Sequence, residues 1–416
     1  MIDGSSARPD YPKCRRPGAP LWLLVAADGS QSLADGIFAV SIALFGASTG
    51  DPLGLGLVLA ARTVPTLFAG LLGGVIADRW KRTTVAAASS AGVALTYVAL
   101  ALLAPTFGLG APVQVLSLVA GLASALGAPS RYAILPSLVP KDKLLHANAI
   151  VRTFRNGGAV VGPLCAGVIF THAPQVAFWS VSVLVAASSL LIWCIPSAER
   201  ANAPQSFVQE LRGIGPLFRR YRWLGPSILF WAIFLAVFAG ASGVLLPMFV
   251  ETQAGGPTWS VLSAFTAGGY ILGSLLALAM KQKTSMLLPG ILVSGLCVLR
   301  LLPVAITDES WIWLCGAVIG GAAMELSGVF WGTFMQSTVQ EEHLGRVSAL
   351  DYAASFGLLP IGYAAYGVVG SAASDMRSVL VATSLGLLLL VVGTVGYLVA
   401  SGASRLAQST RSYPRT

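Results

Sequence analysis

The feature that most constrains this chain is a series of apolar segments, each about as long as a lipid bilayer is thick. A helix needs roughly 20 apolar residues to cross the hydrocarbon core, and its backbone then satisfies its own hydrogen bonds. The sequence predicts an all-α integral membrane protein with twelve transmembrane helices, in two six-helix pseudo-repeats. The predicted segments are 21–47, 53–77, 83–104, 112–138, 147–170, 176–195, 226–249, 258–280, 285–306, 311–338, 347–370 and 377–400.

Composition supports a membrane protein and disfavours other classes. Charged residues make up 10% of the 416-residue chain and hydrophobic residues 55%, whereas soluble domains carry about 25% charge. The net charge of +9 would suggest nucleic acid in a soluble protein. Here the cations cluster in loops, so we expect no nucleic-acid partner. The five cysteines are scattered singly, and we expect no disulfide framework, metal or cofactor.

The distribution of lysine and arginine predicts the orientation. If both termini lie inside, the inner loops and tails contain twenty of these residues and the outer loops contain one, Arg377. Positive residues accumulate on the cytoplasmic side of membrane proteins. A count wrong by one helix would scramble this asymmetry. The pattern therefore predicts cytoplasmic termini and an even number of helices.

The two halves of the chain repeat each other at an offset of 200 residues, so that Gly162 corresponds to Gly362 and Lys81 to Lys281. Parallel six-helix repeats are typical of one transporter architecture. We expect the connection between the halves to form an amphipathic helix on the inner membrane surface, or else an unstructured basic linker. The predicted regions are a cytoplasmic tail 1–20, a first half 21–195, a cytoplasmic linker 196–225, a second half 226–400 and a basic cytoplasmic tail 401–416.

One face of the first apolar segment is polar. Asp28, Gln31, Ser32 and Asp35 follow at spacings of three and four residues, which places them on one side of a helix. Charged groups inside a bilayer are costly and usually face a cavity or a partner. We interpret the stripe as the lining of a water-filled path with candidate proton-coupling residues. The alternative is a structural network between helices.

Arg62, in the second segment, is the expected partner of this stripe. Asp35 and Arg62 are separated from the connection between their two segments by similar numbers of residues. Because each residue of a helix rises about 1.5 Å, the two side chains should lie at a similar depth in the membrane. We expect an Asp35–Arg62 ion pair, in which each charge offsets the desolvation of the other. The pair either takes part in transport or only stabilises the fold.

Other charged residues lie in the later apolar segments. Glu325 is expected to be the only buried acid of the second half. It is a candidate proton carrier, because a carboxyl group in an apolar site can titrate near neutral pH; a hydrogen-bonded core glutamate is the alternative. Arg300 could pair with Glu325 or line the cavity. We interpret Arg131, Arg152 and Arg155, near inner helix ends, as snorkelling to lipid phosphates.

A charged hairpin between the second and third segments resembles a signature of the major facilitator superfamily. Its residues Gly74, Asp78, Arg79 and Arg82 match that signature, with Lys81 at a position where the family usually has glycine. The resemblance implies an alternating-access carrier with its substrate cavity between the halves. It also implies that the hairpin helps to hold the inner side closed. The second half has no matching acid, and we interpret the hairpin as a conformational latch rather than a substrate site.

The fifth segment resembles a signature of the exporters of that superfamily. It contains Gly158, Gly162, Pro163 and Gly167. Glycines four residues apart form a small-residue stripe that lets helices pack closely, and the proline favours a kink.

More narrowly, the chain resembles drug and siderophore exporters of the enterobactin-exporter type. The similar stretches include an inner loop with Gln336, Gly345 and Arg346. One departure concerns proton coupling. Many proton-coupled drug antiporters carry an arginine four residues before a glycine of the fourth helix, whereas here Ser117 precedes Gly121. Asp35 with Arg62 is the substitute that we expect to carry the coupling.

These observations together predict an exporter in the bacterial inner (plasma) membrane. Its expected partners are a hydrophobic or amphipathic small molecule (a drug, siderophore or secondary metabolite), protons moving inward by antiport, and membrane lipid. We expect a monomer. We also expect no enzymatic activity, since the sequence has no Ser/His/Asp or metal cluster. The lack of a phosphate-cradling loop for ATP favours coupling to protons. The alternatives are an importer or uniporter on the same fold, or a non-transporting sensor or lipid-handling protein.

Overall fold

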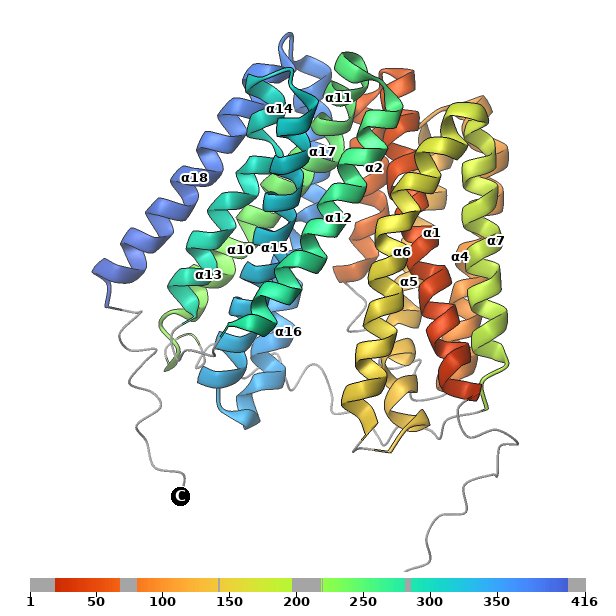
Figure 1. Ribbon diagram of the computed structural model, residues 1–416, viewed down its shortest axis with the longest axis horizontal. Coiled ribbons are helices and arrows are strands. Elements are labelled where there is room, and N and C mark those ends of the chain that lie inside the picture. Colours follow the sequence, from red (N-terminus) through yellow and green to blue (C-terminus); the bar gives the residue numbers. More distant parts are fainter. Residues whose placement is uncertain are drawn as a thin grey trace, which may run out of the picture.

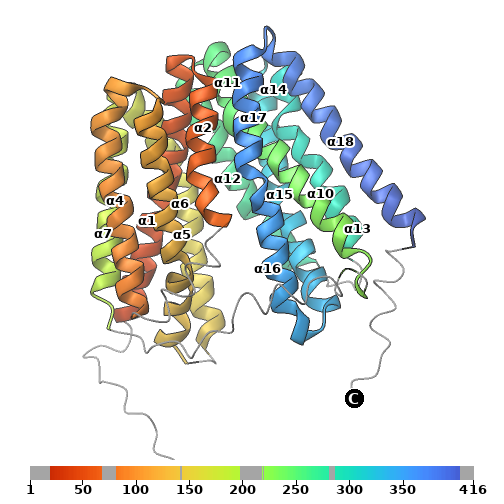
Figure 2. The ribbon, with the colours of Figure 1, turned by 180° about the vertical axis from the view of Figure 1, so that it is seen from behind.

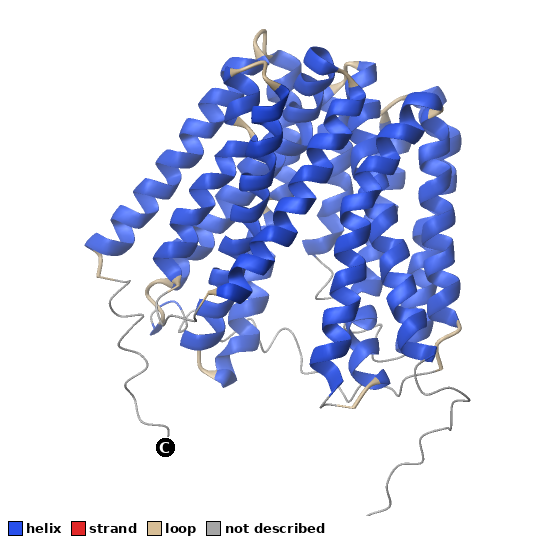
Figure 3. Ribbon diagram, in the orientation of Figure 1, coloured by secondary structure: helices blue, strands red, loops and turns tan. Residues whose placement is uncertain are grey.

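The computed structural model describes residues 19–67, 81–140, 143–196, 218, 220–280 and 286–402. All elements in these ranges are helical, as Figure 3 shows. Within these ranges, ten helical runs are long and apolar enough to cross a membrane, and 52–67 forms a shorter apolar helix. The all-α membrane fold is therefore confirmed. The number of twelve spans stays a prediction, because the second segment continues into residues outside the described ranges and the helix that contains the fifth segment, Leu144–His172, is not among the ten.

The first half of the chain forms one group of helices, red to yellow in Figure 1. Helix α1 packs against α6 and α7, and α4 packs against α5 and α7. The bounds are α1 (Ala19–Thr49), α2 (Pro52–Thr63) continued by the 3-10 turn η1 (Val64–Leu67), α4 (Arg82–Phe107), α5 (Ala111–Leu138), α6 (Leu144–His172) and α7 (Pro174–Trp193).

The second half forms another group, green to blue. Three of its spans are interrupted, and after each interruption a proline occupies the first turn of the next helix: Pro247, Pro303 and Pro360. Proline lacks the backbone donor of a regular helix and clashes with the preceding turn. The bounds are α10 (Leu224–Gly240), the π-helical turn η3 (Ala241–Leu245), α11 (Leu246–Ala254), α12 (Gly256–Ala279), α13 (Leu287–Ser294), the 3-10 turn η4 (Gly295–Arg300), α14 (Leu302–Ile306), α15 (Ser310–Thr338), α16 (Glu341–Gly357), α17 (Leu359–Ala372) and α18 (Met376–Ala400).

Aromatic side chains fill the core between α10 and α15. The ring centroids of Trp223 and Phe334 are 4.7 Å apart, and those of Phe230 and Phe234 are 5.4 Å apart. All four rings are almost fully buried. Such pairs contribute stability beyond the area that they bury. This part of the second bundle is therefore a packed core.

The two bundles contact each other at one end and separate toward the other (Figures 1 and 2). The contacts run from α2 to α17, from α6 to α12 and from α1 to α11. Glycine allows the backbones to approach: a Cβ atom on Gly56 would lie 2.9 Å from Cα of Gly367. At a second contact, Gly167 of α6 faces Ser260 of α12, with only 2.5 Å between such a Cβ and the serine side chain.

Helices α1 and α6 pack equally closely within the first bundle. A Cβ atom on Gly162 would lie 2.7 Å from the carbonyl oxygen of Leu33 and 2.9 Å from Cα of Gly36. One on Gly158 would lie 2.8 Å from the backbone nitrogen of Leu33. The close packing expected for these glycines is present, while the role of this motif in export stays a prediction.

The packing predicts that Gly162→Ala will destabilise the protein. The added methyl group must push α1 and α6 apart, and overpacking of this kind costs about 1–3 kcal/mol. We expect a lower melting temperature for the purified protein in detergent, measured by thermal denaturation.

Gly157→Ala is the matched control, because a Cβ atom at Gly157 of the same helix meets no other atom within 4 Å. This change should be neutral or slightly stabilising, since alanine favours helix more than glycine. Equal melting temperatures for the two variants would contradict the α1–α6 contact.

Candidate functional site

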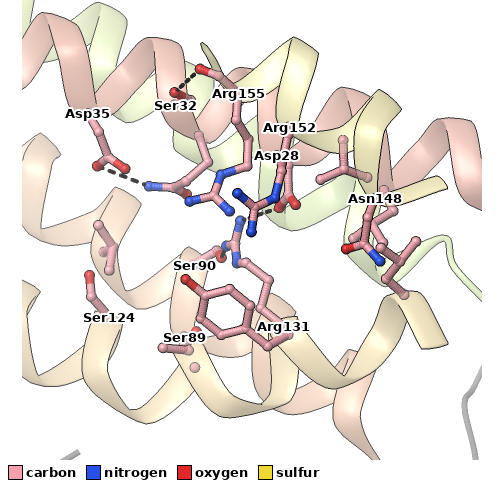
Figure 4. Close-up of a pocket in the computed structure, with 18 of the residues that line it drawn as sticks. Asp28, Ser32, Asp35, Ser89, Ser90, Ser124, Arg131, Asn148, Arg152 and Arg155 are labelled. Atoms are coloured by element: carbon pink, nitrogen blue, oxygen red, sulfur yellow. Dashed lines mark hydrogen bonds and ion pairs between the residues drawn. The ribbon is translucent and has the colours of Figure 1, made fainter. Parts of the chain in front are cut away.

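A polar cavity of about 420 Å³ lies within the first bundle, lined by α1, α2, α4, α5 and α6. Figure 4 shows the side chains that surround it. Its volume is in the range of small-molecule sites. Asp28, Gln31, Ser32 and Asp35 all line it, so the polar face of the first segment is turned toward this space.

The contact expected between Asp35 and Arg62 is present. Nη2 of Arg62 lies 3.6 Å from Oδ1 of Asp35. Gln31 donates a hydrogen bond of 3.3 Å to the same carboxylate oxygen. The Asp35 side chain is 51% exposed and that of Arg62 only 21%. Water in the cavity can therefore reach the carboxylate, while the guanidinium is largely enclosed by protein.

Two aromatic residues hold Arg62 on its other sides. Arg62 donates a hydrogen bond to the hydroxyl oxygen of Tyr97 in α4. Its Cζ atom lies 4.5 Å from the ring centroid of Phe38 in α1, a distance at which a cation and a ring face attract. The sequence analysis did not identify Tyr97 or Phe38 as site residues. An aromatic residue in an apolar segment is consistent with simple packing. Only the rotation of its helix about its axis shows whether the side chain faces the site.

The interpretation of Arg131 as a snorkelling residue is wrong. Its Nη1 atom lies 3.3 Å from Oδ1 of Asp28, and its Nη2 atom donates a 2.6 Å hydrogen bond to Ser90. Arg152 and Arg155 line the same cavity, so they too point into the bundle rather than to lipid. Their nearness to the inner helix ends suggested lipid contact, but α5 and α6 turn these faces inward.

Glu325 lies in α15, outside the lining of this cavity. Ser274 of α12 donates a 2.9 Å hydrogen bond to its Oε1 atom. This contact agrees with the alternative interpretation of Glu325, a hydrogen-bonded glutamate in the core. Within the described ranges, no ion pair joins Glu325 to Arg300. The Cζ atom of Arg300 instead lies 6.0 Å from the ring centroid of Trp259.

Glu325 is not the only buried acid of the second half, so that expectation is wrong. Asp351 in α16 is half-buried and accepts a 3.0 Å hydrogen bond from the indole nitrogen of Trp331. Ser355, one turn further along, donates a longer one of 3.4 Å. The signal was present in the sequence, because Asp351 lies near the beginning of the predicted segment 347–370.

The remaining predicted residues lie elsewhere. Gln336 is in the last turns of α15, and Gly345 and Arg346 are in the first turns of α16, away from the cavity. Arg82 begins α4. The other hairpin residues, Gly74, Asp78 and Arg79, and the amphipathic helix expected in the linker lie outside the described residues.

Comparison with known proteins places the chain in a transporter family. Residues 27–357 match the family model described as Major Facilitator Superfamily. The chain is 28% identical over 400 residues to the multidrug efflux pump Tap of Mycolicibacterium fortuitum, covering 90% of this chain and 95% of Tap. It is 27% identical over 357 residues to the enterobactin exporter EntS of Citrobacter koseri, covering 83% of each chain.

Solved structures share the fold at low sequence identity. A mutant form of the nucleoside transporter NupG superposes with a TM-score of 0.78 at 14% identity, over 91% of this chain and 99% of that one. A bacterial homologue of the iron transporter ferroportin, in its inward-facing state, gives a TM-score of 0.69 at 15% identity, over 92% and 100%. At such identities the likeness concerns the fold alone.

The Asp28–Arg131 contact predicts coupling between these residues in a double-mutant cycle. Asp28→Asn and Arg131→Gln should each destabilise the protein, because each leaves a half-buried charge without its partner. The combined variant should lose less than the sum, by about 0.5–3 kcal/mol, as measured by unfolding in detergent. The exposed Asp308–Arg377 pair, with an N–O distance of 2.8 Å, is the control and should show coupling near 0–1 kcal/mol. Additive effects at Asp28 and Arg131 would contradict the contact.

Proposed function

This chain belongs to the Major Facilitator Superfamily, and we propose that it exports a hydrophobic or amphipathic small molecule from a bacterial cell. Membership makes it a multi-pass membrane transporter rather than an enzyme. The proposal of export rests on relatives that cover most of the chain, an efflux pump and an enterobactin exporter. The observation that carries it is the polar cavity, with ion pairs held in an otherwise apolar bundle.

We infer that this cavity opens to the cytoplasm. The cavity extends from Asp35, midway along α1, to Asn148 near the beginning of α6. The beginning of α6 lies at the end where the bundles separate (Figure 1). This end carries most of the loop cations, which accumulate on the cytoplasmic side. In this orientation the protein faces inward, the state in which an exporter takes up its substrate.

We infer that Asp35 carries the coupling proton. In the inward-facing state its carboxylate is exposed to the cavity and paired with Arg62. A proton that arrives from outside would neutralise Asp35 and release Arg62 from the pair. The proton would then leave to the cytoplasm as the pair forms again. Tyr97 and Phe38 hold the Arg62 guanidinium in place during these steps. The charge of Asp35 therefore changes while Arg62 stays beside it.

Helix α2 provides a route from this pair to the contact between the bundles. Arg62 lies near its end, and Gly56, less than two turns away, packs against Gly367 of α17. A change of charge at Asp35 would therefore act on a short helix that also forms the interface. The hairpin with Asp78 remains our proposed latch on the cytoplasmic side, and Glu325 remains a second candidate for proton binding.

The proposal predicts proton-dependent uptake of a fluorescent amphiphile into everted membrane vesicles. Collapse of the proton gradient should stop uptake, and Asp35→Asn should reduce it about tenfold or more, since an interaction with a charged group contributes about 1.5–3 kcal/mol. Exchange of substrate against substrate needs no proton and should persist in Asp35→Asn. Asp308→Asn, an exposed acid at the other end, is the control.

Three results would separate the alternatives. Uptake that survives a collapsed gradient would overturn proton coupling. Transport retained by the combined Asp35→Asn and Arg62→Gln variant would reduce the pair to a stabilising contact. Uptake only by right-side-out vesicles would indicate import on the same fold.

A further inference from the structure

The described lining of the cavity carries more positive than negative charge. Among the described residues, four arginines and two acids line it, and each acid has an arginine within ion-pair distance: Arg62 lies at Asp35 and Arg131 at Asp28. Two guanidinium groups remain, those of Arg152 and Arg155. Both residues are exposed in the first turns of α6, so their charges face the open part of the cavity.

Arg152 and Arg155 lie one turn apart on the same face of α6, so their side chains are neighbours. Within the described ranges, no carboxylate lies within ion-pair distance of either guanidinium. Figure 4 shows both side chains reaching the same part of the cavity as Arg131. The backbone at this point is anchored, because the Ser32 hydroxyl of α1 donates a 2.6 Å hydrogen bond to the carbonyl oxygen of Arg155. The two cations are thus presented from a fixed helix.

We propose that Arg152 and Arg155 form a subsite for an anionic oxygen group, and that the transported molecule is an anionic amphipath. The planar guanidinium presents paired donors that match a carboxylate, sulfonate or phosphate group. The assignment rests on the export function proposed above and narrows its substrate class. A cationic amphipath would instead add like charge to a cavity that already has an excess of arginine.

The cavity also has an apolar side for the rest of such a molecule. Leu24 of α1, Val93 of α4 and Leu135 of α5 line it together with Val151, which is adjacent to Arg152 in the chain. These side chains are themselves well packed, with at most 8% of their surface exposed. With an anionic head at the arginines, the apolar body of such a molecule would meet the narrow strip of hydrophobic surface that these side chains leave exposed.

Three dansyl probes of one size test the charge preference: dansylglycine, which is anionic, dansylglycinamide, which is neutral, and a dansyl trimethylammonium derivative. Binding is measured by fluorescence with the full-length protein in phosphatidylcholine nanodiscs. We expect the anion to bind about tenfold more tightly than the neutral probe, which corresponds to one charge-assisted contact. The cation should bind most weakly.

Changes at the arginines should alter only the anionic probe. The combined Arg152→Gln and Arg155→Gln variant should lose about tenfold in affinity for dansylglycine and keep that for dansylglycinamide. The Arg152→Lys and Arg155→Lys pair should recover part of the loss, which also shows that the site is folded. Arg377→Gln, at the other end of the molecule, is the matched control. Unchanged affinity for the anion in the glutamine variant, or tighter binding of the cation, would overturn the proposal.

A lipid phosphate is the other source of the same chemistry. If phosphatidylglycerol added to the nanodiscs displaces dansylglycine in an arginine-dependent manner, the subsite holds a headgroup and the substrate assignment is wrong. Retained probe binding supports the assignment. Vesicle uptake of the neutral probe tests export separately. Arginine-dependent binding of the anion without uptake of any probe would refute export and leave the anion subsite standing.

Discussion

The first bundle is organised by the cost of holding a charge away from water. Asp28 and Asp35 lie on the polar face of a largely apolar helix, and each has a cation nearby that offsets its charge. Arg131 supplies one from α5 and Arg62 the other from α2. These two contacts require α1 to turn its polar face toward the cavity. The rotation of α1, which helps to shape the cavity, is thus consistent with charge compensation on one face and apolar packing on the other.

Close backbone approach is the second requirement, and glycine meets it. Gly36 and Gly162 bring α1 against α6, and Gly56 and Gly367 bring the two bundles together at α2 and α17. Helix α1 is thus fixed on one side by backbone contact with α6 and on another by ion pairs. The cavity that α1 lines therefore keeps its form. Helix α2 takes part in both kinds of contact, which makes it the shortest physical link between the cavity and the bundle interface.

Much of this arrangement could be predicted from the sequence, because it depends on local regularities. The length of the apolar segments predicts the helices, and the spacing from Asp28 to Asp35 predicts the polar face. The similar depth of Asp35 and Arg62 in the membrane predicts their contact. The rest depends on how whole helices rotate about their axes. That rotation decides whether Arg131 meets lipid or Asp28, and whether Tyr97 packs or hydrogen-bonds. No short-range pattern encodes it, since every face of α4 and α5 is largely apolar.

The interrupted helices of the second bundle have a mechanical consequence. A continuous helix resists bending because its backbone hydrogen bonds must lengthen together. A helix that is interrupted at a proline or a π-helical turn has fewer regular hydrogen bonds at that point, so it bends more easily. The spans that contain Pro247, Pro303 and Pro360 are therefore compliant, whereas α1 of the first bundle runs without interruption from Ala19 to Thr49 and is comparatively stiff. The inner side of such a molecule can close by flexing one half against a nearly rigid other half, so that the ion pairs keep their geometry while the opposite wall moves.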